Sequence, residues 1–255
     1  MILLKRLAAE LIGTFGMVFA GTGAIMINEL SGGKVTHLGM GITFGLIVAA
    51  MIFTFGSKSG AHINPAVTLG FASTRRIRWG VAAYYIPAQL AGGILASLAL
   101  YYLLGPAANM GATLPSGSVE QSLVLEGILT FILMAIIMSL SIEPRIAGPV
   151  AALAIGGTVG LEAIFAGPIS GASMNPARSP LAPALVGWEW YGHWAYWVGP
   201  IAGAALGAVV VCWLKGVRIF GSEEAKEAEN ATDEDQELAL KGREQRSSRP
   251  AEEAD

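Results

Sequence analysis

Two stretches of the sequence, residues 59–66 and 170–177, carry the same pattern of small and polar residues. Ser-Gly-Ala-His-Ile-Asn-Pro-Ala in the first half corresponds to Ser-Gly-Ala-Ser-Met-Asn-Pro-Ala in the second. Asn is a favoured N-cap and Pro a favoured first helical residue, so a helix is expected to begin at Asn64 and at Asn175. Each Asn amide can then donate hydrogen bonds beside the positive end of a helix dipole. These groups suit the binding of a small polar molecule.

Catalytic and metal chemistry are not indicated. The chain has three His and one Cys, and they are scattered along the sequence. Neither a zinc-type ligand cluster nor a nucleophile–base–acid triad can be assembled from them by spacing. We therefore expect no enzyme activity, no metal and no cofactor.

The helices that begin at the two Asn residues are too short to cross a bilayer, which takes about 20 apolar residues. They are expected over Asn64–Ala72 and Asn175–Val186. Short apolar segments of this kind are buried loops or re-entrant half-helices. Six longer segments can cross the bilayer: Leu7–Ile27, Leu38–Phe55, Gly80–Leu104, Ser122–Ser141, Pro149–Phe165 and Trp194–Leu214. The fifth of them is short and is bounded by Gly167-Pro168.

The composition places most of the chain in a membrane. It is 53% hydrophobic and 14% charged, and residues 1–221 hold only 7 acidic and 11 basic residues. So few charges cannot cover a soluble domain of this size, which excludes a soluble enzyme and a nucleic-acid-binding protein. Residues 222–255 hold 12 acidic and 5 basic residues and no aromatic residue. We therefore expect a membrane domain over residues 1–220 and a disordered charged tail over residues 221–255.

The basic residues indicate the orientation in the membrane. Most of them lie before the first span and after the second, fourth and sixth, where they include Lys5, Arg76, Arg145 and Lys215. Because cytoplasmic loops carry an excess of Lys and Arg, both termini and the tail are expected in the cytoplasm.

The two halves form an internal repeat, over residues of about 1–104 and 119–218. Glu10, Thr14 and Phe15 match Glu126, Thr130 and Phe131 in register. Each unit has three crossings, and because that number is odd the second unit is inverted relative to the first. Inverted repeats with broken helices that meet at mid-membrane are typical of transport proteins.

These features together identify a family resemblance. The sequence resembles the major intrinsic protein (aquaporin) family along residues 1 to about 218. The resemblance rests on the two Asn-Pro-Ala boxes, on Arg178 directly after the second box, and on the paired Glu residues of the two halves. The resemblance implies an all-α membrane fold of six transmembrane helices and two re-entrant half-helices. It also implies a homotetramer in the cell membrane, plasma or inner, with a pore in each protomer. The implied function is passive passage of water and small uncharged solutes, with exclusion of protons and ions.

The resemblance also assigns the residues of the pore. The Asn-Pro-Ala boxes (Asn64, Pro65, Ala66 and Asn175, Pro176, Ala177) would meet at its centre. The carbonyl groups of the preceding strands (Gly60, Ala61, His62, Gly171 and Ser173) would line it. The narrow outer filter would comprise Phe44, Ala163, Ala172 and Arg178.

The filter does not decide between a water channel and a channel for larger solutes. Strictly water-selective members have a His where this chain has Ala163, so the filter should be wider and admit glycerol, urea, ammonia or metalloid hydroxides. Against this, Ser179 and Tyr196-Trp197 follow the water-channel pattern. The Ser170–Asn175 segment looks like the plant nodulin-like branch and its bacterial relatives, which mix these features.

The buried acids allow a different class of function. Glu10 and Glu126 could be the proton-coupling groups of a secondary transporter, or structural acceptors for free backbone amides of the re-entrant loops. Their symmetry favours the structural role. Glu162 has no counterpart, and is expected either at the pore vestibule or bonded to a loop. An integral-membrane scaffold is a weaker alternative, and would be indifferent to replacement of Arg178.

Overall fold

The structure is a computed structural model, and it describes residues 2–143, 148–179 and 190–219. All regular structure in these ranges is helical, and six of the helices are long and apolar enough to cross a membrane. A seventh, shorter helix lies among them in the first half. The bounds are α1 (Ile2–Leu30), α2 (Thr36–Ser59), α3 (Pro65–Ser73), α4 (Trp79–Leu104), the 3₁₀ turn η1 (Ala107–Gly111), α5 (Val119–Ile142), α6 (Pro149–Ser170) and α8 (Ala195–Leu214).

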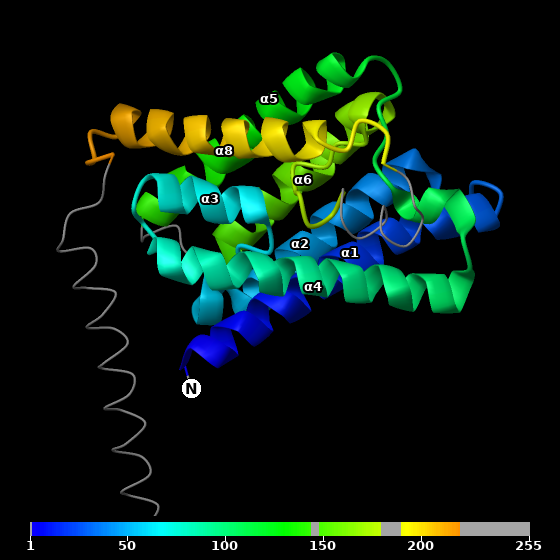
Figure 1. Cartoon of the computed structure of the whole chain (residues 1–255), viewed down its shortest axis with the longest axis horizontal. Coiled ribbons are helices and arrows are strands. Elements are labelled where there is room, and N and C mark those ends of the chain that lie inside the picture. Colours follow the sequence, from blue (N-terminus) through cyan, green and yellow to red (C-terminus); the bar gives the residue numbers. More distant parts are fainter. Residues whose placement is uncertain (1, 144–147, 180–189, 220–255) are drawn as a thin grey trace, which may run out of the picture.

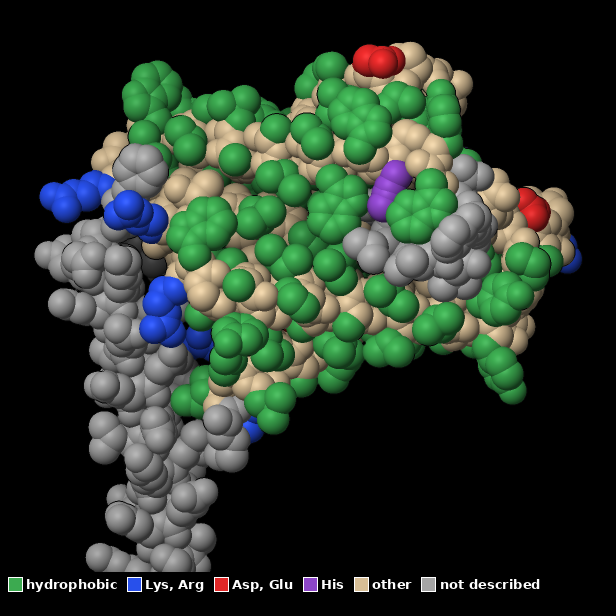
Figure 2. Space-filling view, viewed as in Figure 1, with side chains coloured by type: hydrophobic (Ala, Val, Ile, Leu, Met, Phe, Trp, Pro, Cys, Tyr) green, Lys and Arg blue, Asp and Glu red, His purple; other side chains and the backbone are tan. Residues whose placement is uncertain are grey.

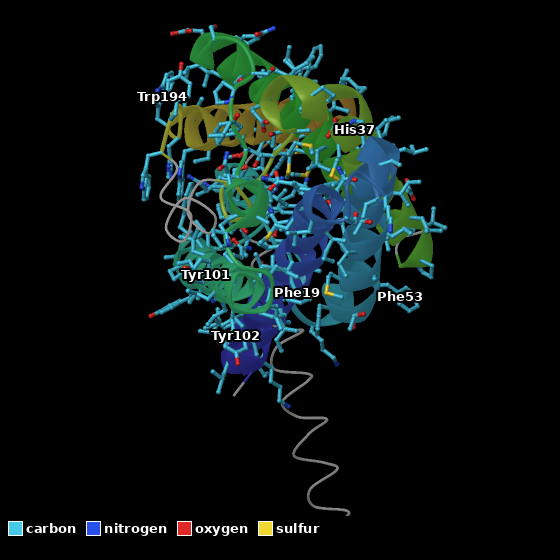
Figure 3. All side chains as sticks on the ribbon, turned by 90° about the vertical axis from the view of Figure 1, so that its right-hand side faces the viewer. Phe19, His37, Phe53, Tyr101, Tyr102 and Trp194 are labelled. Carbon is cyan, nitrogen blue, oxygen red and sulfur yellow. The ribbon has the colours of Figure 1, made fainter. Side chains whose placement is uncertain are left out.

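The six predicted spans are confirmed, and α3 is the first predicted half-helix. The end predicted for the fifth span is wrong, because α6 continues through Gly167-Pro168 to Ser170. Pro168 has no N–H, so it cannot bond to the carbonyl of Ile164 one turn earlier. That carbonyl instead accepts a hydrogen bond of 2.6 Å from Nε2 of His37 on α2. The side chain of another helix thus compensates for the proline, and Figure 3 shows His37 beside α6.

The helices form two corresponding groups, α1, α2 and α4 from the first half and α5, α6 and α8 from the second (Figure 1). In each group the first helix packs on the second and the third, and α2 and α6 pack against each other between the groups. The half-helix α3 lies against α8 of the other group and α4 of its own. This arrangement is the inverted repeat predicted from the sequence. The N-terminus and the end of α8 lie at the same end of the bundle (Figure 1).

Glycine residues hold the helices close together at equivalent places in the two halves. A Cβ on Gly92 of α4 would lie 2.3 Å from the carbonyl oxygen of Leu11, and one on Gly203 of α8 would lie 2.1 Å from that of Gly127. Both distances are far inside van der Waals contact. Only glycine permits this approach, which is the usual role of small residues between membrane helices.

The surface fits a bilayer. Hydrophobic side chains cover much of the face of the bundle seen in Figure 2, and Lys and Arg gather at the end where α8 finishes. Trp194 and Tyr101 lie at the periphery of the bundle (Figure 3), and both are about half exposed. Amphipathic aromatic side chains are favoured where a membrane meets water.

Candidate functional site

One cavity of about 550 Å³ lies between the two halves and is lined by both of them. On α2 its lining runs from Phe44 to Ser57, a length of roughly 20 Å along the helix axis. The predicted residues that line it are Phe44, Gly60, Ala61, His62, Asn64, Ala163, Ala172, Ser173, Asn175 and Arg178. The remaining predicted residues do not line it: Glu10, Pro65, Ala66, Glu126, Gly171, Pro176 and Ala177.

The two Asn residues meet across the repeat at the middle of the cavity. Asn64 is the N-cap of α3, since its Oδ1 accepts from the backbone N–H of Ala66 at 2.8 Å. Oδ1 of Asn175 likewise accepts from Ala177 at 2.9 Å. The amide of Ser179 bonds to the carbonyl of Asn175 at 3.1 Å, which is a first helical turn. The rest of the second predicted half-helix, from residue 180 to Val186, lies outside the described residues.

Each Asn amide also holds the opposite half. Nδ2 of Asn64 donates to the carbonyl of Met174 at 2.8 Å, and Nδ2 of Asn175 donates to that of Ile63 at 2.9 Å. A primary amide has two N–H groups, so each Asn retains a second N–H besides the one that holds the opposite half. The second N–H of Asn175 has a further neighbour, the thioether Sδ of Met17 on α1, at 3.5 Å from Nδ2.

The strands that precede the Asn residues are held by the paired acids. Glu10 accepts four hydrogen bonds of 2.6–3.0 Å, from Ser59 Oγ, Gln89 Nε2 and the amides of His62 and Ile63. Glu126 accepts three of 2.7–2.9 Å, from Ser170 Oγ and the amides of Ser173 and Met174. The structural interpretation of the two acids agrees with this geometry, in which every carboxylate oxygen accepts at least one hydrogen bond.

The strands have an unusual backbone that the acids stabilise. Four of their non-glycine residues lie in the left-handed region, with φ of 43–54° at Ala61, Ile63, Ala172 and Met174. Such a conformation costs on the order of 1–2 kcal/mol per residue, so it needs support from outside the strand.

The same conformation leaves backbone acceptors free. The carbonyls of Gly60, Ala61, His62, Gly171, Ala172 and Ser173 accept no hydrogen bond from any described residue. Unpaired carbonyls at membrane depth are tolerated where they face a wet cavity.

Two of the predicted filter residues, Phe44 and Arg178, lie against each other. The guanidinium carbon of Arg178 lies 5.1 Å from the ring centroid of Phe44, and its Nη1 donates to the carbonyl of Gly111 at 3.1 Å. The Nε–H of Arg178 has no partner among the described residues. Ala163 and Ala172 also line the cavity, and Arg178 has the one polar side chain of the four filter residues.

The side chains of His62 and Cys212 contact other side chains of the protein. His62 lines the cavity, bonds to Thr68 Oγ1 at 3.1 Å and stacks on Phe71. Cys212 is buried between helices, with its Sγ 3.8 Å from Nη2 of Arg76. In the described part of the chain no three His, Cys, Asp or Glu side chains are grouped as metal ligands.

Glu162 does not line the cavity, and the predicted hydrogen bond to a loop is not found among the described residues. It is only 2% exposed, and neither carboxylate oxygen has a hydrogen-bond partner among the described residues. Sequence reasoning also missed Met17 and Leu133, which line the cavity from equivalent positions of α1 and α5. Each follows its repeat's Glu by seven residues. That spacing places both on the Glu-bearing face two turns later, and it could have revealed them.

The inverted helical repeat around a central cavity defines a membrane channel. Residues 1–211 match the model of the family described as "Major intrinsic protein". The chain is 47% identical over 206 residues to "Aquaporin NIP1-1" of Oryza sativa subsp. japonica, covering 80% of this chain and 72% of the relative. It is 48% identical over 211 residues to "Probable aquaporin NIP-type" of Nicotiana alata, covering 82% and 77%.

A solved structure shows the same fold. The X-ray structure of the aquaglyceroporin from Plasmodium falciparum matches with a TM-score of 0.72 and 24% identity, over 83% of this chain and 95% of that one. The chain belongs to the major intrinsic protein family, and its similarity to the plant relatives confirms the predicted likeness to the nodulin-like branch. It is a multi-pass membrane protein and a passive channel for water and small neutral solutes, and members of this family are channels rather than enzymes.

Proposed function

We propose that the cavity is a single-file pore in which a molecule passes the filter formed by Phe44, Ala163, Ala172 and Arg178 and then the Asn64–Asn175 pair. The observation that carries the proposal is the pattern of hydrogen-bonding groups. Free backbone carbonyls accept along the pore, and one N–H of each Asn donates at its centre. An uncharged molecule that both donates and accepts can replace its water contacts at every step.

The same pattern opposes protons and cations. A water molecule at the centre must direct its oxygen to the Asn donors, so its hydrogens point away along the pore and the proton-conducting chain is interrupted. The positive end of α3 and the charge of Arg178 repel cations. The acids Glu10 and Glu126 are occupied by backbone amides, which supports a passive channel over an ion-coupled transporter.

Water and small neutral solutes are the proposed cargo of this pore, and the chain is not an enzyme. We infer a homotetramer in the plasma or inner membrane, with both termini cytoplasmic. Residues 1–220 are the channel domain and residues 221–255 a cytoplasmic tail. The relatives named aquaporins and the basic end of the bundle (Figure 2) support this assignment.

A second cargo is favoured by Ala163. A methyl group stands here where a larger side chain would narrow the filter, so glycerol, urea or a metalloid hydroxide would fit better than in a water-selective pore. The structure of an aquaglyceroporin has the same fold, which is compatible with either cargo.

The test is stopped-flow light scattering on proteoliposomes, with osmotic shrinkage for water and re-swelling for glycerol and urea. Ala163→His should abolish solute re-swelling and retain water flow, because the imidazole narrows the filter and remains polar. Ala163→Leu is the control of similar bulk without polarity, and it should slow both. If proteoliposomes with the wild-type protein shrink fast and do not re-swell, the protein is a water channel. If they pass neither water nor solute, the proposed pore is disproved.

A further inference from the structure

Of the equivalent cavity-lining residues Met17 and Leu133, only Met17 carries a sulfur atom. Met17 lines the cavity, is 5% exposed, and places Sδ 3.5 Å from Nδ2 of Asn175. The equivalent residue of the second half is Leu133, which also lines the cavity. The N–H of Asn64 is therefore free for a passing molecule, whereas that of Asn175 has a thioether as its neighbour.

A thioether is a weak hydrogen-bond acceptor, so a passing molecule can displace it. Any solute that accepts a hydrogen bond from Asn175 must then come into contact with Sδ of Met17. Hydrogen peroxide is uncharged, close to water in size, and able to donate and accept at both ends. It fits the chemistry of the proposed pore, and it oxidises thioethers.

We propose that Met17 is an oxidation site by which hydrogen peroxide in the pore lowers its permeability. A lone pair of Sδ attacks one peroxide oxygen and the O–O bond breaks. That oxygen stays on sulfur, and the other leaves as water with both hydrogens. The sulfur is oxidised by two electrons to methionine sulfoxide, and the peroxide is reduced.

The sulfoxide differs from the thioether in its strength as a hydrogen-bond acceptor. A sulfoxide oxygen is a polar acceptor in place of a weak one. With Sδ at 3.5 Å from Nδ2, an oxygen bonded to that sulfur can come within hydrogen-bond reach of the Asn175 amide when it is directed toward it. It therefore occupies the donor that the passing molecule needs. Displacing such a bond slows passage by about twofold to tenfold.

The inference rests on the proposed pore and is tested separately from it. Reconstituted wild type, Met17→Leu and Met174→Leu are exposed to hydrogen peroxide, which is then removed with catalase before water permeability is measured. Met174 is the matched control because it also lines the cavity, next to Asn175. Peptide mass spectrometry measures sulfoxide at Met17 and at the buried Met134, which lies off the cavity.

After peroxide, water permeability is expected to fall by about twofold to tenfold in wild type and in Met174→Leu. Peroxide should leave the water permeability of Met17→Leu unchanged. In wild type, Met17 should be oxidised well before Met134. Loss in Met17→Leu, or full permeability of a channel oxidised at Met17, overturns the proposal. Unreacted Met17 overturns it as well. If wild type conducts no water before peroxide is added, the proposed function is refuted instead. The order in which Met17 and Met134 are oxidised then still shows whether peroxide reaches Met17.

Discussion

Glu126 and Glu162 are both buried carboxyl groups of the second half, and replacing each by methionine should change stability in opposite directions. Methionine is similar in size to glutamate, so the comparison isolates the polar contacts. Glu126→Met leaves the amides of Ser173 and Met174 without their acceptor. At about 1–3 kcal/mol for each buried orphan, the variant should lose roughly 2–6 kcal/mol.

Glu162→Met removes no hydrogen bond to the described residues, because neither oxygen has a partner among them. Burial of a polar group without a partner costs about 1–3 kcal/mol, so this variant should gain a similar amount. In a chain of this size, 1 kcal/mol corresponds to roughly 2–4 °C in Tm. The two variants should therefore lie on opposite sides of wild type by several degrees.

The chain provides its own probe for the measurement. Cys212 is its one cysteine and is buried, so a thiol-reactive dye reports unfolding of the detergent-solubilised protein on heating. Destabilisation by Glu162→Met equal to that by Glu126→Met would refute the reasoning, since Glu162 would then hold a bonded group. An unchanged Tm in Glu126→Met would show that the strand does not depend on its acid.

Two further predictions concern packing and the pore centre. Gly203→Ala should destabilise the protein by about 1–3 kcal/mol, because the new Cβ would overlap the carbonyl of Gly127. Gly157 has open space around it, so Gly157→Ala should be neutral or slightly stabilising. The same dye assay compares the two variants. Replacing Asn64 and Asn175 together by Leu removes both N-caps, at about 0.5–2 kcal/mol each, and both central donors. Proteoliposomes with this variant should lose water selectivity over protons, and unchanged selectivity would contradict the proposed role of the donors.

The sequence predicted the features that repeat or that carry local signals. The start of α3 at Asn64 follows from N-cap and proline chemistry, and the paired acids follow from their register. The end of α6 was mispredicted because the partner of the carbonyl freed by Pro168 comes from His37, 127 residues away in the chain. A distant compensating contact of this kind leaves no local signal.

Two other features were beyond local reasoning for physical reasons. Met17 is one apolar residue in an apolar helix, and only the spacing from Glu10 distinguishes it from residues that face lipid. Glu162 was expected at the vestibule or bonded to a loop because it adjoins the filter position Ala163 and has no counterpart in the first half. Its burial without one among the described residues could not be expected from sequence.

The free carbonyls of the two strands bear on how such a protein can change in evolution. Five of the acceptors at the cavity belong to the main chain, at positions 60–62, 172 and 173, and every amino acid supplies the same carbonyl. A codon change therefore cannot delete them, and can disturb them only by altering the backbone path. Inherited changes of cargo are confined to a few side chains, such as Ala163. The ability to conduct an uncharged polar molecule is thus buffered against mutation, while the choice among such molecules remains free to drift.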